Sequence, residues 1–241
     1  MSKILLFEAL KCKETERPGW VPFVGVHGGY LIDKKADEYL KSSRLIVQGL
    51  NKAIEFYKPD GIPIVFDLQL EAEVLGCELQ WHEETPPSVV SHPLQSEKWI
   101  DDLPDFDTEK GRLPIVREAC KTLASSISAE VALYGLITGP FTLSAHLRGS
   151  DLFYDLLAEP NRVHELMEFA KCVGYKMIDF YLGAGCEVIA IVDPMTSQIS
   201  PAHFHDFVAP YLNYLFEKVR EGGALSSLFV CGDATKNLEV M

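Results

Sequence analysis

Five short apolar runs, almost free of charge, dominate the hydrophobic pattern of this chain. They span residues 21–26, 62–66, 131–137, 186–192 and 225–230. Short apolar runs bounded by glycine, proline and polar residues are typical of strands buried on both faces, as in a parallel sheet.

Between these runs, apolar residues recur at helical spacing. Ser200 and Pro201 mark one helix start, because Ser caps a free backbone N–H and Pro fits the first turn. Alternating strands and helices predict an α/β fold with parallel strands. The helices expected from the spacing cover residues 5–12, 37–57, 71–75, 113–127, a stretch opening at 139, 161–182, 201–220 and a last one from 235.

Five strand–helix units in series predict a TIM (β/α)8-type barrel that is incomplete at the C-terminus. A full barrel needs about 250 residues, so about five of eight strands are expected here. Residues 78–108 carry four prolines and many acids, which indicates an irregular surface excursion within a single domain, 1–241. An open five-stranded sheet is the alternative.

The net charge of −13, from 22 basic and 35 acidic residues, argues against nucleic acid and anionic membranes as partners. No apolar run reaches the length of about 20 residues that crosses a bilayer. The N-terminus has no signal-peptide pattern, so a cytoplasmic location is expected. The six cysteines form no C-x-x-C pair, which disfavours a disulfide framework or a closed zinc knuckle.

Polar side chains follow three of the predicted strands. Asp67, Asp193 and Cys231 come directly after apolar runs, and the carboxyl ends of parallel strands meet at one edge. We therefore expect a common rim around one cavity, with the two aspartates catalytic and Cys231 a metal ligand. The structural alternatives are a helix cap for Asp67, a turn before Pro194 for Asp193, and a small core filler for Cys231.

Histidine and glutamate side chains near the same edge are further candidates. His146 could serve in acid–base catalysis, with a hydrogen-bonded filler as the alternative. Glu71 and Glu73 could complete a polar or metal site, although a solvated helix start is favoured for both. Four side chains are placed to line the cavity and bind substrate: His27, Tyr30, Gln69 and Phe141.

Several motifs, in order along nearly the whole chain, resemble the uroporphyrinogen decarboxylase superfamily. One is a strand ending in aspartate, which is followed here by Val74-Leu75-Gly76. Others are a proline–aromatic–threonine motif and an SP…F…PY helix. The resemblance implies a TIM barrel, in agreement with the hydrophobic pattern. The stretches that carry it are residues 60–67, 73–78, 139–143, 199–201 and 207–212.

Departures from the decarboxylase pattern indicate another branch of the superfamily. The two arginines of the decarboxylase signature align with Gly25 and Gly29, and a substrate with many carboxylates needs such guanidinium groups. His146 replaces the active-site tyrosine and Pro194 a serine, so Asp67 alone remains of the polar set. Genuine uroporphyrinogen decarboxylation is therefore not expected.

The last predicted strand resembles that of the methylcobalamin:coenzyme M methyltransferases. Their H-x-C-G stretch supplies His and Cys to zinc, which activates an acceptor thiol. Cys231 and Gly232 match this stretch, whereas Phe229 stands at the histidine and cannot bind a metal. A catalytic zinc site needs about three protein ligands. Zinc is therefore an expected cofactor for which Cys231 is the one recognisable ligand in the sequence.

The leading hypothesis is a methyltransferase that takes a methyl group from a corrinoid on a partner protein. The acceptor would be a small thiol or a pterin. One alternative is a lyase acting on a small, less acidic substrate, with Asp67 stabilising charge. Another is a non-catalytic fragment or interaction subunit, and self-association into a homodimer is left open because unpaired strand edges tend to pair.

Overall fold

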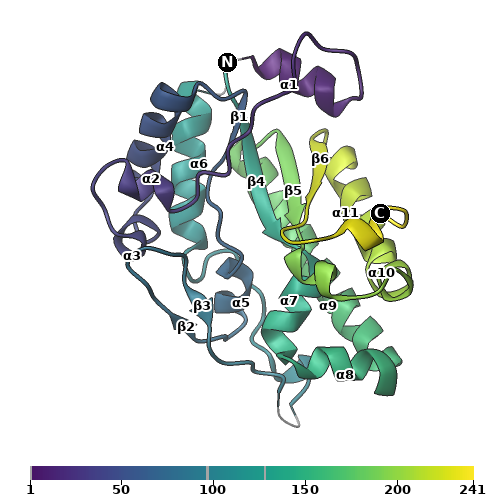
Figure 1. The fold of residues 1–241 in the computed structure, drawn as a ribbon. Helices are drawn as coiled ribbons and strands as arrows, with labels where there is room; N and C mark the ends of the chain where they lie inside the picture. The colour runs from purple at the N-terminus through teal and green to yellow at the C-terminus, as the bar shows by residue number, and fades with distance from the viewer. Residues whose placement is uncertain (1, 96–97, 128) are drawn as a thin grey trace.

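A parallel sheet of four strands forms the centre of the molecule in the computed structural model, which describes residues 2–95, 98–127 and 129–241 (Figure 1). The strand order is β1–β4–β5–β6. Tyr134 lies opposite Val188, which in turn lies opposite Leu225. The four strands are β1 (Gly61–Pro63), β4 (Ala132–Thr138), β5 (Val188–Val192) and β6 (Leu225–Phe229).

Helices connect these strands, and a short antiparallel pair, β2 (Leu79–Gln80) with β3 (Ser88–Val89), lies within the predicted excursion. The α-helices are α1 (Lys3–Leu10), α2 (His27–Tyr30), α3 (Ala36–Tyr39), α4 (Ser43–Tyr57), α5 (Leu70–Val74), α6 (Leu113–Ile127), α7 (Pro140–Arg148), α8 (Asp151–Ala158), α9 (Pro160–Ala184), α10 (Pro201–Phe207) and α11 (Ala209–Glu221). The described residues also form the 3-10 turns η1 (Ile100–Asp102), η2 (Pro194–Gln198) and η3 (Thr235–Asn237).

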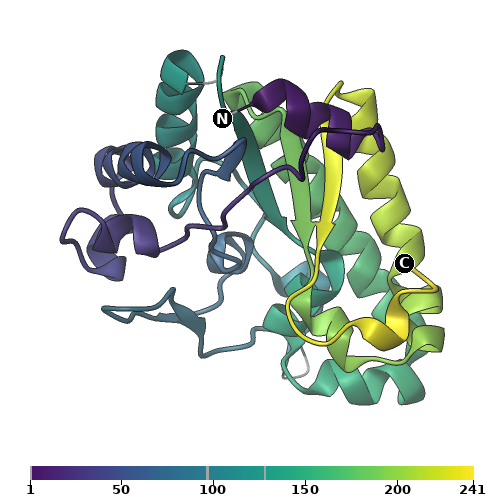
Figure 2. The same cartoon turned by 45° about the horizontal axis from the view of Figure 1, so that its top comes forward.

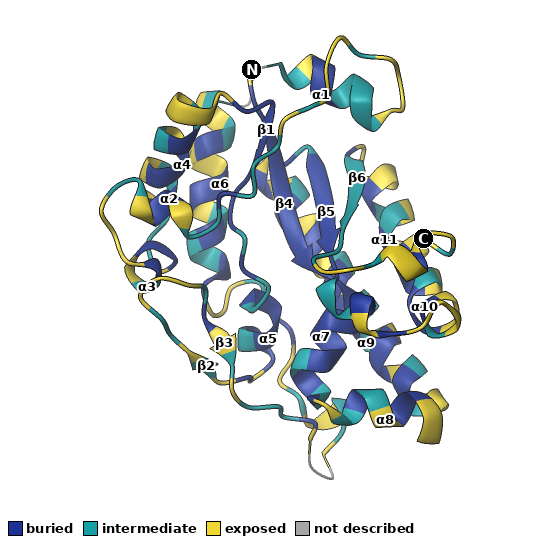
Figure 3. Cartoon of the chain, viewed as in Figure 1, coloured by how far each residue is buried: buried dark blue, intermediate teal, exposed yellow. Residues whose placement is uncertain are grey.

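Alternate side chains of the central strands enter two separate apolar clusters. Ile189 and Ile191 pack in the larger cluster, with the helices on one face of the sheet. Val188 and Ala190 belong to the smaller cluster, together with Leu6 of α1. Figure 2 shows α1 and the extended segment after it in front of the sheet, with the green and yellow helices behind. In Figure 3, β4 and β5 are buried along their length, whereas β6 is half-buried.

The expected strand at residues 21–26 is wrong, because the structure gives these residues no strand. Pro22 lacks the N–H that a strand ladder requires. Val24 N instead donates to Pro22 O at 3.1 Å, and Gly25 turns the chain at φ +52°. Across the described ranges the parallel sheet therefore has four strands rather than five.

The expected continuous helix at residues 201–220 is split in two. Ser200 caps α10 as predicted, since its hydroxyl accepts from His203 N at 3.2 Å. Pro210 cannot donate to a carbonyl one turn earlier, and the backbone changes course at Val208 between α10 and α11. Among the helices described, none has both the length and the apolar character to cross a membrane.

Candidate functional site

The carboxyl ends of the four parallel strands meet along one edge, which we call the C-terminal rim and define by Asp67, Thr138, Asp193 and Cys231. Backbone hydrogen bonds continue past the ends of β4 and β5. Gly139 N donates to Val192 O at 2.8 Å, and Asp193 N donates to Phe229 O at 3.0 Å. The strand order thus brings residues distant in sequence to one edge of the molecule.

Asp67 forms a buried ion pair with Arg112, a residue that no motif in the sequence marks. Its other oxygen accepts from Gln69 N at 3.0 Å. The same guanidinium donates through Nε to Glu73 at 2.8 Å and lies 4.8 Å from the centre of the Trp81 ring. Because the Asp67 side chain is fully buried with both oxygens bonded, this geometry favours orientation over direct contact with a substrate.

Asp193 supplies the N-terminal cap that α7 cannot provide for itself, because its N-cap residue is Gly139. One carboxylate oxygen accepts from Phe141 N at 3.2 Å. The other accepts from Thr142 N at 2.8 Å and from Thr142 Oγ1 at 2.6 Å. Burial raises the pKa of Asp193 to about 6, opposed by these hydrogen bonds, which favour the ionised form.

Glu71 is not at a solvated helix start, so that expectation is wrong for this residue. It is 2% exposed, and its carboxyl group meets Thr138 N at 2.9 Å and Thr138 Oγ1 at 2.7 Å. Burial raises the pKa of Glu71 to about 7. Its neighbour Glu73 stays partly exposed while it binds Arg112.

His146 lies in the last turn of α7. The hydrogen-bond partners of Asp67 and Asp193 given above do not include it. Its backbone carbonyl accepts from His92 Nδ1 at 2.8 Å, while its own Nδ1 is buried without a partner in the described structure. Burial lowers the pKa of His146 to about 4, so the imidazole is neutral near pH 7.

The four predicted substrate-binding residues do not gather in one place. His27 and Tyr30 belong to α2, which packs beside α4 on the opposite side of the molecule from β5 and β6 (Figures 1 and 2). His27 Nε2 lies 2.6 Å from the Tyr57 hydroxyl. Phe141 is fully buried in the core. Gln69 lies beside Asp67, and its buried Oε1 has no hydrogen-bond partner among the described residues.

Cys231 follows β6 at the rim, and burial raises the pKa of its thiol. Two residues earlier, Phe229 stacks on Phe23 with ring centres 4.4 Å apart, and its ring lies 6.1 Å from that of Phe66. No three His, Cys, Asp or Glu side chains in the described ranges gather as a metal site requires. The described donors therefore do not fit a catalytic zinc centre, and zinc stays a prediction with Cys231 as its one ligand.

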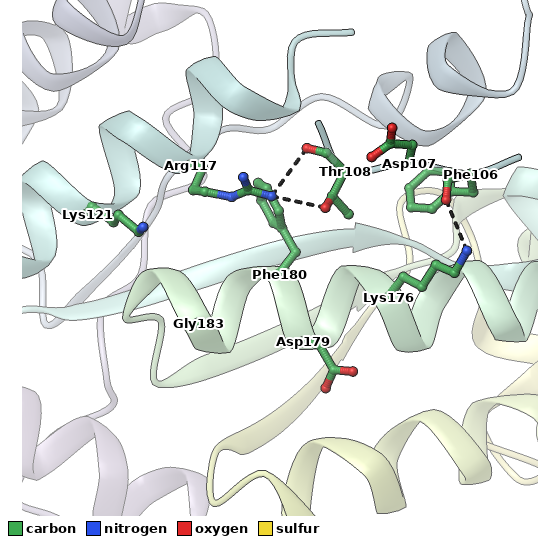
Figure 4. A pocket seen from close by; sticks show the side chains of 9 residues that line it. All are labelled: Phe106, Asp107, Thr108, Arg117, Lys121, Lys176, Asp179, Phe180 and Gly183. Carbon is green, nitrogen blue, oxygen red and sulfur yellow. Dashed lines mark hydrogen bonds between the residues drawn. The ribbon is translucent and has the colours of Figure 1, made fainter. Parts of the chain in front are cut away.

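Two cavities, of about 580 and 540 Å³, lie away from the rim. The first opens between α6 and α9 (Figure 4), where Arg117 donates to Thr108 and Lys176 donates to Phe106 O at 3.0 Å. These two cations attach the segment before α6 to the helices. The second is lined by Tyr30 and the start of α3, and neither cavity includes a residue of the rim.

The family described as "Uroporphyrinogen decarboxylase (URO-D)" has a sequence profile that matches residues 1–241. The chain belongs to the uroporphyrinogen decarboxylase family. This confirms the resemblance found in the sequence motifs.

Two proteins with sequences similar to this chain are methyltransferases. A "Methylcobamide:CoM methyltransferase" of Methanosarcina acetivorans is 26% identical over 76% of this chain and 55% of its own length. A "Methylated-thiol--coenzyme M methyltransferase" of Methanosarcina mazei is 30% identical over 72% of this chain and 47% of its own. The chain therefore spans about half the length of these curated relatives.

A solved structure titled "methyltransferase from Methanosarcina mazei" superposes on 97% of this chain and 70% of its own, with a TM-score of 0.86 and 21% identity. This match, with the family assignment, confirms the predicted fold class, a TIM-type α/β architecture with parallel strands. Barrel closure is absent from the four-stranded sheet of the described residues.

Proposed function

We propose that this protein takes part in methyl transfer from a corrinoid, carried by a partner protein, to a small thiol or pterin acceptor. The observation that carries the proposal is the similarity to two coenzyme M methyltransferases over about three quarters of the chain. The rim, with its one half-buried thiol and its buried carboxyl groups, is the surface on which we place the transfer.

The corrinoid would supply an electrophilic methyl group, and the acceptor must present a lone pair, as a thiolate does. In this proposal Asp67 and Arg112 fix the start of α5, because the ion pair is buried and extends to Glu73 on that helix. Asp193 fixes the start of α7 through three hydrogen bonds. Of the three residues predicted to share the rim, Cys231 is more exposed than Asp67 and Asp193, and it would meet the acceptor.

A decarboxylase-like lyase is the second candidate, because a "Uroporphyrinogen decarboxylase" of Gloeobacter violaceus is 25% identical over 92% of this chain. The environment of Gly29 weighs against an arginine-rich carboxylate site. A Cβ there would lie 2.9 Å from Tyr39 Cβ and 3.0 Å from Lys34 O, so a larger side chain would displace a buried tyrosine.

An assay of the full chain with methylcobalamin and a small thiol separates the two candidates. We expect the methylcobalamin absorption spectrum to change in the dark only when protein and acceptor are both present. Cys231→Ala should slow this change, whereas Cys12→Ala, at an exposed thiol, should not. Carbon dioxide release from small carboxylated substrates without methyl transfer would instead support the lyase.

The same preparation tests zinc. Since no three potential ligands gather in the described ranges, we expect substoichiometric zinc after dialysis of the 241-residue chain and no change in activity with a chelator. One tightly bound zinc per chain, lost in Cys231→Ala, would show that further ligands reach Cys231.

A further inference from the structure

The hydrogen bonds between the carboxyl group of Glu71 and the hydroxyl of Thr138 depend on how many protons the two groups carry. Thr138 Oγ1 lies 2.7 Å from Glu71 Oε2 and 3.0 Å from the backbone carbonyl oxygen of Leu68. A hydroxyl has one proton to donate, and a carbonyl oxygen can only accept. With an ionised Glu71, Thr138 faces two acceptors and can satisfy only one of them.

A proton on Glu71 satisfies every group in this cluster. Glu71 Oε2–H then donates to Thr138 Oγ1, and the Thr138 hydroxyl donates to Leu68 O. The remaining carboxyl oxygen, Oε1, accepts from Thr138 N at 2.9 Å. A protonated carboxyl has one O–H donor as well as acceptor capacity, so all three distances correspond to real hydrogen bonds.

The surroundings of Glu71 favour the neutral form. The residue is 2% exposed, and an isolated buried charge is strongly disfavoured. Asp67 adds a like charge nearby, and the Arg112 guanidinium is bonded to Asp67 and Glu73 rather than to Glu71. The Tyr181 hydroxyl is fully buried and has no hydrogen-bond partner in the described structure, so it does not donate to Glu71.

We infer that Glu71 is a protonated carboxylic acid in the folded protein, and that it is a positioning residue which ties α5 to the end of β4. Leu68 and Glu71 belong to the same segment as Gln69 and Glu73. The two hydrogen bonds of the Thr138 hydroxyl, to Leu68 and to Glu71, therefore set where this segment lies relative to the sheet. Loss of the proton places a second anion beside Asp67. The Thr138 hydroxyl must then donate to the carboxylate, and its hydrogen bond to Leu68 O is lost.

The consequence is a pH-dependent attachment of α5. Burial raises the pKa of Glu71 from 4.5 to about 7, so the stabilisation from the protonated form is complete below about pH 4.5 and is lost as pH rises through 7. Asp193, raised to about 6, titrates in part of the same range. An experiment must therefore distinguish glutamate from aspartate. The inference does not depend on methyl transfer.

Carbon-13 NMR of the full chain with labelled glutamate Cδ atoms makes this distinction. We expect one glutamate resonance to titrate more than one pH unit above the others, and to vanish in Glu71→Gln. Glu38→Gln, at an exposed Lys34–Glu38 pair, is the matched control and should leave that resonance in place. A spectrum in which all glutamates titrate near the ordinary value would overturn the inference.

Stability against pH gives a second readout for the same variant. A glutamine amide can donate to Thr138 Oγ1 and accept from Thr138 N, as the protonated acid does. Glu71→Gln should therefore match the wild type in urea unfolding at pH 5 and exceed it at pH 8. If Glu71→Gln is the less stable protein at both pH values, the carboxylate is required and the proposal is wrong.

Discussion

Among the described residues, three buried carboxyl groups lie at or beside the C-terminal rim, and each has a different kind of partner. Asp67 is paired with the Arg112 guanidinium, Glu71 with the Thr138 hydroxyl, and Asp193 with the amides at the start of α7. A cation compensates only the first of these groups directly. The partner, rather than burial alone, thus determines which carboxyl group stays ionised.

Removing the charge of Asp67 leaves Arg112 buried with only the partly exposed Glu73. Breaking a buried ion pair on one side typically costs about 3 to 5 kcal/mol, and we expect a loss of this size for Asp67→Asn in urea unfolding. The control is Glu8→Gln, which breaks an exposed pair with Lys13 and should cost less than about 1 kcal/mol. Equal effects of the two substitutions would contradict the buried pair.

Gly139 is required by the approach of Asp193 rather than by its backbone angles, which any residue can adopt. A Cβ at this position would lie 2.3 Å from Asp193 Cγ. Gly139→Ala should therefore lower the free energy of unfolding by about 1 to 3 kcal/mol. Gly183→Ala, in helix α9, should instead raise it by about 0.5 to 1 kcal/mol, because no described atom beyond the neighbouring residues and backbone of that helix lies within 4 Å of the new Cβ. Thermal unfolding of both variants measures this contrast.

For single residues, the sequence predicts where a side chain lies along the fold better than it predicts which groups surround that side chain. Asp193 and Cys231 follow β5 and β6 closely, as expected, because apolar runs and their ends are visible in the sequence, whereas β1 already ends at Pro63, four residues before Asp67. The partners of these residues are not visible there. Arg112 reaches Asp67 from 45 residues away, and Glu71 is buried because α5 packs onto the end of β4, which no local pattern reveals.

Among the elements, the N-terminal segment is attached to the sheet through Asp60, just before β1. Its carboxylate accepts from Ser2 N at 2.6 Å and Trp20 N at 2.9 Å, and it pairs with Arg17 through two nitrogens at 2.6 and 2.8 Å. A single side chain thus joins both ends of the region that covers one face of the sheet.

This attachment predicts acid sensitivity. The hydrogen bond from Arg17 lowers the pKa of Asp60 from 3.8 to about 2. Its stabilisation is present above about pH 3.8 and is lost as pH falls through 2. Urea unfolding should show wild-type stability falling from pH 4 to pH 2, with a smaller fall in Asp60→Asn. An exposed variant such as Glu84→Gln should follow the wild type, and an unchanged fall in Asp60→Asn would refute the role of this carboxylate.

The elements that sequence patterns predicted well are those with one dominant signal. Helix α6 begins and ends at the expected residues, 113 and 127, because its apolar periodicity is long and regular. The segment 21–26 has the apolar content of a strand, but Pro22 and Gly25 decide its course. Apolar content alone therefore does not reveal that a backbone N–H is missing or that the chain turns through a left-handed conformation.

For the whole molecule, the sheet ends in two strands with one neighbour each, β1 and β6, in the described ranges. Unpaired strand edges promote association, so a homodimer remains a prediction. We expect sedimentation to show mass increasing with concentration, and Ser227→Lys on β6 to reduce it, whereas Ser125→Lys, on the surface of α6, should not. A single monomeric mass at all concentrations would contradict this.

Transfer of an isotopically labelled methyl group tests the central claim, that the C-terminal rim carries out methyl transfer. The full chain is incubated in the dark with carbon-13 methylcobalamin and a small thiol, and the methylated thiol is quantified by mass spectrometry. We predict labelled product with the wild type and with Arg117→Lys, which lies at the cavity between α6 and α9. Arg112→Lys, which cannot bridge Asp67 and Glu73 in the same geometry, should lower the yield at least about tenfold. No labelled product from the wild type, or equal yields from both variants, would contradict the account.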